Sequence, residues 1–73
     1  MRPDHVYFLS NPHPSDNPDA PAFAIVHIHD EHADYRSSTA DGRLVRHEAH
    51  LPRQTAALYL SRARERGWTW RRY

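Results

Sequence analysis

The sequence predicts an α+β domain: a small antiparallel sheet of three to five strands with one amphipathic helix packed on one face. Two observations predict this class. Short runs rich in β-branched and aromatic residues alternate with turn-forming residues, as in hairpin-connected strands. Near the C-terminal end, residues 52–66 have apolar residues at the spacing of a helix. A chain of 73 residues has the size of one domain, so we expect residues 1–73 to form a single unit.

The best strand candidate is the apolar run at residues 22–29, which reads AFAIVHIH. Alternate residues of a strand share a face, and one face of this strand is wholly apolar, so we expect it to pack against the helix. Its residues are Ala24, Val26 and Ile28. The other face begins with Phe23 and Ile25 and ends with histidines, so its end should open to solvent. Residues 5–9, HVYFL, form another candidate strand.

Residues 10–21 are expected to form a proline-rich loop. They read SNPHPSDNPDAP, with four prolines and no large apolar side chain. Each proline lacks a backbone donor and biases the residue before it towards extended structure, which argues against a regular element. The charged residues nearby are acidic, and this disfavours a proline-rich ligand for an SH3-type groove.

A hairpin is expected after the central strand. An acidic turn at residues 30–34 leads into a polar strand at 35–39, whose composition favours an exposed or edge position. Asp41 and Gly42 form a common hairpin pair, and the chain should return as a strand over residues 43–51. Regular alternation would divide this strand into one face with Val45, His47, Ala49 and Leu51 and another with Arg46, Glu48 and His50.

The helix is predicted over residues 52–66. Pro52 suits the first helical position, where a missing N–H is tolerated. Apolar residues at i, i+3, i+4 and i+7 form the expected buried stripe, namely Ala56, Tyr59, Leu60 and Ala63, with Leu58 at its margin. Gly67 can take the left-handed conformation that ends many helices, so Trp68 should fold back on the last turn. Residues 68–73, WTWRRY, alternate and are expected to be a short strand.

Charge is unevenly distributed along the chain. Residues 1–50 carry a net charge of −4 and residues 51–73 one of +5, and all ten basic residues are arginines. Such asymmetry suggests an anionic partner for the C-terminal part or head-to-tail self-association, although a solvated helix face explains it equally well. The predicted partner-binding residues are Arg62, Arg64, Arg66, Trp70, Arg71 and Arg72, together with Asp30, Glu31 and Asp34.

The histidines after the central strand have metal-ligand spacing. Residues 27–32 read H-x-H-x-E-H, which resembles the H-x-H-x-D-H signature of metallo-β-lactamase-like hydrolases. The resemblance covers six residues and has Glu where the signature has Asp. The chain is also far shorter than the chains that form that hydrolase fold. We therefore do not infer hydrolase activity from the resemblance. The expectation is a histidine-rich surface without a cofactor. The alternative is one zinc ion bound by His27, His29 and His32, with His47 or His50 as a further ligand.

The residue types present argue against catalysis. The chain has no cysteine and only two glycines, and it contains no glycine-rich phosphate loop. Its serines lie outside any nucleophile elbow. The carboxylates of residues 30–34 lie in an expected surface turn, where no buried environment would tune them for acid–base work. We therefore expect that the protein is not an enzyme. Among enzyme classes, these residues are most compatible with a small histidine-based ribonuclease.

These observations favour a non-catalytic protein that acts by protein–protein contact, because Trp, Tyr and Arg are enriched in interface hot spots. Small size and the lack of familiar motifs suggest a phage or mobile-element inhibitor of a nucleoprotein complex, of the anti-CRISPR type. The alternatives are a nucleic-acid-binding domain that uses the C-terminal arginines and tryptophans and a zinc-binding protein. A homodimer through an edge strand, 35–39 or 68–73, is a further expectation. With no signal-peptide pattern and no apolar span, a cytoplasmic location is expected.

Overall fold

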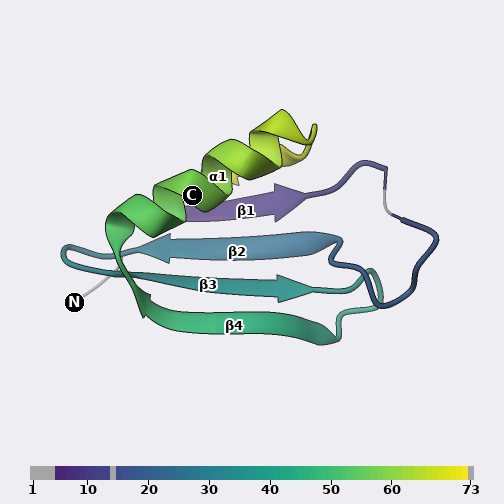
Figure 1. The fold of residues 1–73 in the computed structure, drawn as a ribbon, viewed down its shortest axis with the longest axis horizontal. Coiled ribbons are helices and arrows are strands. Elements are labelled where there is room, and N and C mark those ends of the chain that lie inside the picture. Colours follow the sequence, from purple (N-terminus) through teal and green to yellow (C-terminus); the bar gives the residue numbers. More distant parts are fainter. Residues whose placement is uncertain (1–4, 14, 73) are drawn as a thin grey trace.

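The computed structural model describes residues 5–13 and 15–72 and confirms the α+β class. Five antiparallel strands form one sheet in the order β4-β3-β2-β1-β5, and one helix packs on it (Figure 1). The elements are β1 (His5–Ser10), β2 (Phe23–Ile28), β3 (Ala33–Ser38), β4 (Leu44–Leu51), α1 (Arg53–Glu65) and β5 (Thr69–Arg72). Pro14 of the expected loop and Tyr73 of the expected last strand lie outside the described residues.

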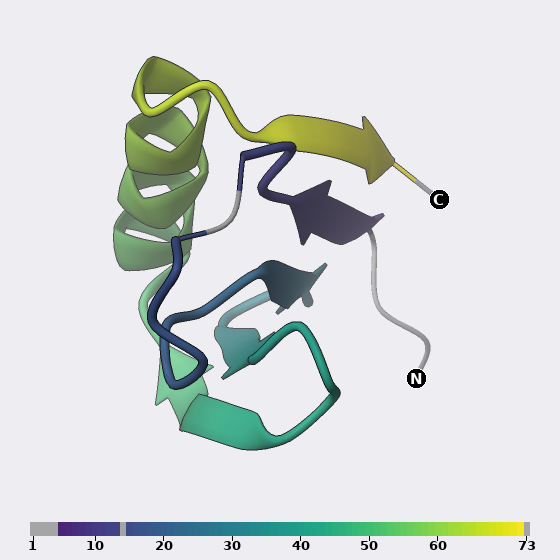
Figure 2. The same cartoon turned by 90° about the vertical axis from the view of Figure 1, so that its right-hand side faces the viewer.

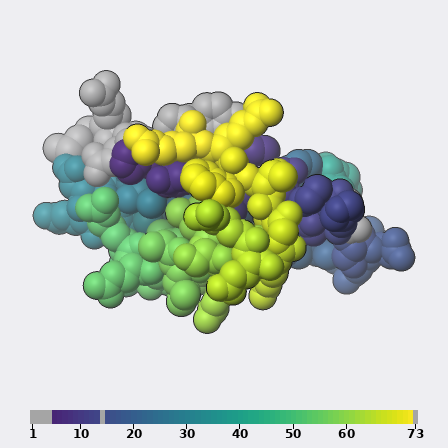
Figure 3. Space-filling view, turned by 90° about the horizontal axis from the view of Figure 1, so that it is seen from above, coloured from purple at the N-terminus to yellow at the C-terminus, as the bar shows by residue number. Residues whose placement is uncertain are grey.

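The chain builds the sheet as a meander and then crosses it once. Strands β1 to β4 each pair with the next strand in sequence. Helix α1 then carries the chain back over the sheet, so that β5 pairs with β1 at the opposite edge from β4. Figure 3 shows the yellow C-terminal segment against the purple β1, beside the green helix. Within the described part of the chain, α1 is too short and too polar to cross a membrane.

The predicted edge position of residues 35–39 is wrong, because β3 lies between β2 and β4. The edges of the sheet are β4 and β5. The polar composition of this segment has a different cause, since Ser37 of β3 and Thr39 just after it fit small buried positions. Ser37 and Thr39 are both 3% exposed, and the Thr39 hydroxyl donates to Asp41 while accepting a bond from the Arg43 backbone N–H. Hydroxyl side chains can be buried at low cost when they are bonded in this way.

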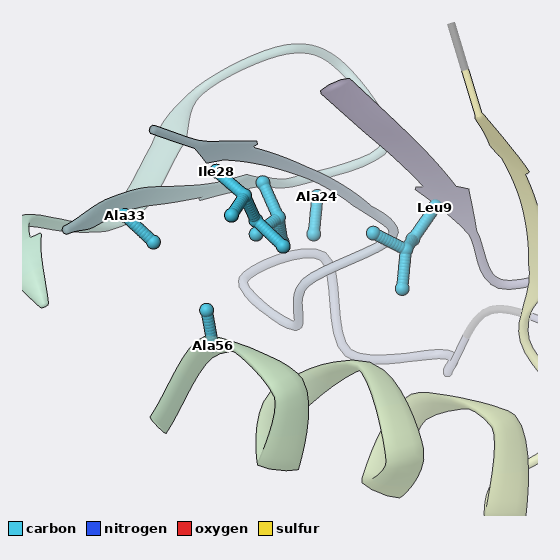
Figure 4. Packing of buried hydrophobic residues seen from close by; sticks show 6 residues of the cluster. Leu9, Ala24, Ile28, Ala33 and Ala56 are labelled. Carbon is cyan, nitrogen blue, oxygen red and sulfur yellow. The ribbon is translucent and has the colours of Figure 1, made fainter. Parts of the chain in front are cut away.

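The core lies between α1 and the apolar face of β2, as predicted. The buried cluster comprises Leu9, Ala24, Val26, Ile28, Ala33 and Ala56. Figure 4 shows the sheet residues of this cluster pointing towards the helix, with Ala56 pointing back at them. Three of its six members are alanines, so the helix backbone comes close to the sheet and little apolar volume is available. The predicted marginal position Leu58 is outside this core, because its side chain is 47% exposed.

A β-bulge near the end of β4 overturns the regular alternation predicted for residues 43–51. The register changes from Tyr35 opposite Glu48 to Ala33 opposite Leu51, so one extra residue is present on β4. The extra residue is accommodated at His50, whose φ is 58°. Leu51 is thereby turned onto the helix side, where it packs against the core, and Glu48 lies on the same side, where it bonds α1.

The C-terminal end of α1 forms as the sequence predicts, but its start differs by one residue. Pro52, expected at the first helical position, is the N-terminal cap, and Arg66 is the C-terminal cap. Gly67 has a φ of 84°, and its N–H donates to the Arg64 carbonyl, while the Trp68 N–H donates to the Ala63 carbonyl at 3.0 Å. This pair of bonds is the Schellman motif. It reverses the chain and directs Trp68 onto the core, from where β5 starts.

Candidate functional site: the helix-free face of the sheet

The face of the sheet opposite α1 has an apolar centre. Because Leu9, Ala24 and Val26 point under the helix, alternation turns Phe8 and Ile25 to the other side. Phe8 lies opposite Ile25 in the β1–β2 register, and the Phe23 ring centroid is 6.0 Å from that of Phe8. All three side chains are half-buried. Figure 2 shows the sheet nearly end-on, with α1 on one side of it.

Two arginines flank this apolar centre in a row that crosses the whole sheet. In the strand registers, Arg71 of β5 lies opposite Phe8, and Arg36 of β3 lies opposite Ile25. His47 of β4 continues the row beyond Arg36. We call these five residues the cross-sheet row. Arg36 and Arg71 are exposed, and neither forms a salt bridge with any other residue that the structure describes.

The surface around the cross-sheet row is hollowed rather than flat. One hollow of about 200 Å³ is lined by Phe8, Phe23, Ile25 and Arg36, among others. A second hollow, of about 130 Å³, adjoins it between Ile25 and His47. Both are smaller than a typical small-molecule pocket of roughly 300–1,000 Å³, but a third hollow of about 400 Å³, lined by Phe8, Trp70 and Arg71 among others, reaches that range. Hollows therefore lie at both ends of the row, and they offer room for side chains of a partner macromolecule.

The arginines and tryptophan predicted as one contact surface are divided between the two sides of the molecule. Alternation along β5 puts Arg71 on the helix-free face, while Arg72 lies opposite Tyr7 and Trp70 opposite Leu9 on the helix side. The Trp70 ring packs 5.5 Å from Tyr7. The Arg64 guanidinium lies 5.4 Å from the Trp70 ring, which is a cation–π contact within the fold.

The other two predicted arginines line a groove on the helix side. Arg62 and Arg66 are one turn apart on α1 and, together with Arg46 of β4, surround a hollow of about 160 Å³. Leu9, Trp68 and the two tyrosines of the helix–sheet contact also line this groove. Arg46 was missed by the sequence analysis, because only the return of β4 beneath α1 brings it near the C-terminal helix turns.

The predicted acidic residues are also separated. Asp30 and Glu31 are exposed in the turn between β2 and β3. Asp34 was expected in that turn but belongs to β3. The His50 backbone N–H donates to Asp34 Oδ1 at 3.1 Å, and this bond, with the adjacent His29 imidazole, lowers the pKa of the Asp34 carboxyl below its usual value.

The histidines converge in a different set from the predicted one. Ligand atoms of His29, His32 and Asp34 all lie within 4.8 Å of one another. His27, a predicted ligand, is outside this group, and its ring centroid is 6.4 Å from that of His29. Asp34 replaces His27 as the third member of the group, because the pairing of β3 with β2 brings the Asp34 carboxylate to the end of β2. His50 contacts the group, with its ring 4.8 Å from that of His32, whereas His47 belongs to the cross-sheet row.

No family model matches the chain, and neither a curated protein nor a solved structure is significantly similar to it. The functional argument therefore rests on the faces of the fold themselves. The sequence analysis missed Phe8, Phe23, Ile25 and Arg36 as site residues. A signal for them was present, because β2 is apolar on both faces and one predicted helix can cover only one of them.

Proposed function

We propose that this domain is a non-catalytic module that binds a partner protein through the helix-free face of its sheet. The observation that supports the proposal is the cross-sheet row, in which Phe8 and Ile25 lie between Arg71 and Arg36. An apolar centre with a charged rim is the usual organisation of a protein interface. The matching surface on a partner is an apolar side chain or ridge flanked by carboxylates.

The two parts of this face contribute differently to binding. Aromatic side chains near the centre of an interface give most of the affinity, since they exchange water for packing. Charges at the rim contribute about 0.2–1 kcal/mol each, but they orient the partner and raise the association rate. Phe8 and Phe23 should therefore determine affinity, and Arg36 and Arg71 should determine which partner is accepted.

A protein partner is favoured over nucleic acid by the charge on this face. The chain has a net charge of +1, and the cross-sheet row offers two permanent cations. Binding that neutralises two phosphates would have a logarithmic salt slope of only about −1.8, typical of a weak nucleic-acid ligand. Stacking of bases on Phe8 and Phe23 is the competing use of the same face, and a salt titration distinguishes it from protein binding.

The first partner to assay is a nucleoprotein complex of the bacterial-defence kind, following the expectation of an anti-CRISPR type inhibitor. Such an inhibitor acts by occupying a surface and needs no chemistry of its own. Small size and an apolar face with a charged rim support this assignment within the binding class.

Neighbouring arginines of β5 provide the test of the binding face. Arg71 and Arg72 differ in the face on which they lie, so Arg71→Glu should weaken partner binding about tenfold, whereas Arg72→Glu should leave it unchanged. Phe23→Thr should weaken binding about 30-fold or more, and Leu58→Gln on the exposed side of α1 is its control. The measurement is calorimetric titration of partners captured from the host and identified by mass spectrometry.

The same set of variants can refute the proposal. Equal losses for Arg71→Glu and Arg72→Glu would exclude a face-specific contact. Loss of binding in the double variant Arg62→Glu/Arg66→Glu, with wild-type affinity in Arg71→Glu, would move the contact to the groove beside α1. Circular dichroism of each variant establishes that it is folded before its affinity is compared.

A further inference from the structure

The turn between β2 and β3 brings together two imidazoles and a carboxylate. His29 and His32 are both partly buried, as is Asp34, and their ligand atoms lie within 4.8 Å of one another. The imidazole rings of His29 and His32 are stacked, with centroids 4.5 Å apart. Asp34 Oδ2 lies 3.1 Å from His29 Nε2. The binding face proposed above does not require any of these three side chains.

Backbone contacts position each member of this group. The His29 N–H donates to the His32 carbonyl at 2.8 Å, which closes the turn and places the two rings on the same side. Asp34 is set by the β2–β3 register, in which it lies opposite His27. The bulge at His50 directs its N–H at Asp34 Oδ1. One carboxylate oxygen is thus occupied, and the other is turned towards the imidazoles.

This arrangement has the form of a metal site with a supporting outer contact. Ligating carboxylates are commonly held by a hydrogen bond to their second oxygen, as Asp34 is held by His50. Zinc ligands lie about 2.0–2.1 Å from the ion, so atoms in a tetrahedral set are about 3.3 Å apart. The His29–Asp34 distance of 3.1 Å is already close to this value, and His32 offers its ligand atom within 4.8 Å of both.

We propose that His29, His32 and Asp34 bind one divalent transition-metal ion of the zinc class. Two imidazole nitrogens and one carboxylate oxygen form a donor set that zinc accepts, and the hard cations Mg²⁺ and Ca²⁺ prefer oxygen ligands. The three ligands come from the turn after β2 and from β3, and the His50 contact extends the site to β4. Binding therefore joins three strands at one end of the sheet.

The test is a titration of the full chain, without a histidine tag, with zinc chloride. We expect one equivalent to bind and to shift the imidazole resonances of His29 and His32. At a zinc concentration about 100 times Kd, the Tm should rise on the order of 10 °C. Magnesium chloride at the same concentration should produce neither effect.

Matched histidine variants separate this site from general histidine affinity. His29→Gln and His32→Gln should each weaken zinc binding at least tenfold, and His27→Gln and His13→Gln should leave it unchanged. The Tm of each variant without zinc shows whether the fold is intact. X-ray absorption of the zinc-loaded protein, which counts nitrogen and oxygen neighbours, gives a readout that does not depend on stability.

Three results would overturn the proposal. The first is the absence of any resonance or Tm shift at stoichiometric micromolar zinc, which would leave the His29–Asp34 contact as a simple ion pair. The second is equal weakening by His27→Gln and His29→Gln, which would indicate diffuse binding along the strand. The third is binding of several equivalents with no loss in any single variant.

Discussion

Tyr59 joins α1 to β4 through its hydroxyl. The Tyr59 hydroxyl donates to Glu48 Oε2 at 2.9 Å, and its ring meets the Tyr35 ring edge-on at 4.9 Å between centroids. The Arg46 guanidinium lies 5.6 Å from the same ring and pairs with Glu48. The hydrogen bond to Glu48, with the negative charge of that carboxylate, raises the pKa of Tyr59 above its usual value of 10.0.

This contact predicts a pH dependence at the alkaline end. Because the folded state favours the protonated phenol, its stabilising effect is complete below the pKa of an unfolded tyrosine and is lost as the pH rises through the higher folded-state pKa of Tyr59. A nuclear magnetic resonance titration of Tyr59 should show it ionising at a higher pH in the folded protein than in the unfolded chain, and Glu48→Gln should lower that pH. Ionisation of Tyr59 at the same pH in the folded and the unfolded protein would contradict this prediction.

At the scale of the element, the end of α1 determines where β5 begins. The left-handed Gly67 allows the Schellman bonds to form, and these bonds turn Trp68 onto the core. Without that reversal the chain would leave the helix in another direction, and β5 could not pair with β1. The cross-sheet row would then lose Arg71.

Substitution of Gly67 should therefore have a backbone cost. Gly67→Ala should lower the free energy of unfolding by about 1–2 kcal/mol, measured by urea denaturation. A Cβ at this position would meet no atom within 4 Å, so the whole cost is conformational strain. Gly67→Asn is the matched control and should cost less, because asparagine tolerates this conformation better. Unchanged stability in Gly67→Ala would argue against the helix ending described here.

At the scale of the whole molecule, one helix covers one face of a five-stranded sheet. The resulting core is small, and a domain of 73 residues has a total stability of roughly 4–11 kcal/mol. Each buried apolar side chain therefore contributes a large fraction of the stability. The same geometry leaves the apolar side chains of the opposite face without a helix above them, which is the basis of the proposed binding face.

Two adjacent residues of β2 test this one-sided architecture. Val26 is 0% exposed beneath α1, so Val26→Ala should lower the free energy of unfolding by about 2–3 kcal/mol through the cavity it leaves. Ile25 is half-buried on the helix-free face, and Ile25→Ala removes more carbon but should cost only about 1 kcal/mol, because solvent fills the space. Equal costs in urea denaturation would indicate that the second face is also enclosed.

Much of the fold could be predicted because local rules decide it. The helix with its proline start and glycine end, the Asp41-Gly42 turn and the apolar face of β2 all follow from residue spacing and backbone preference. The position of β3 could not be predicted in the same way. Its polar residues are typical of an edge strand, and only the strand order accounts for the burial of Ser37 and of the adjacent Thr39.

The candidate sites were less predictable, since each combines residues distant in sequence. The sequence identified the histidines after β2, but Asp34 replaces His27 only because of the β2–β3 register. The row from Arg71 to His47 depends on four strand pairings at once.

By itself, the sequence determined the class of fold, the helix with both its ends, and the face of β2 that is buried. Those features depend on periodicity and on the conformations open to single residues, and both act over a few neighbours. Strand order, the bulge at His50 and the division of the C-terminal arginines between two faces were decided by the tertiary structure alone. They depend on which strand lies beside which, and that follows from packing the whole chain around one small core.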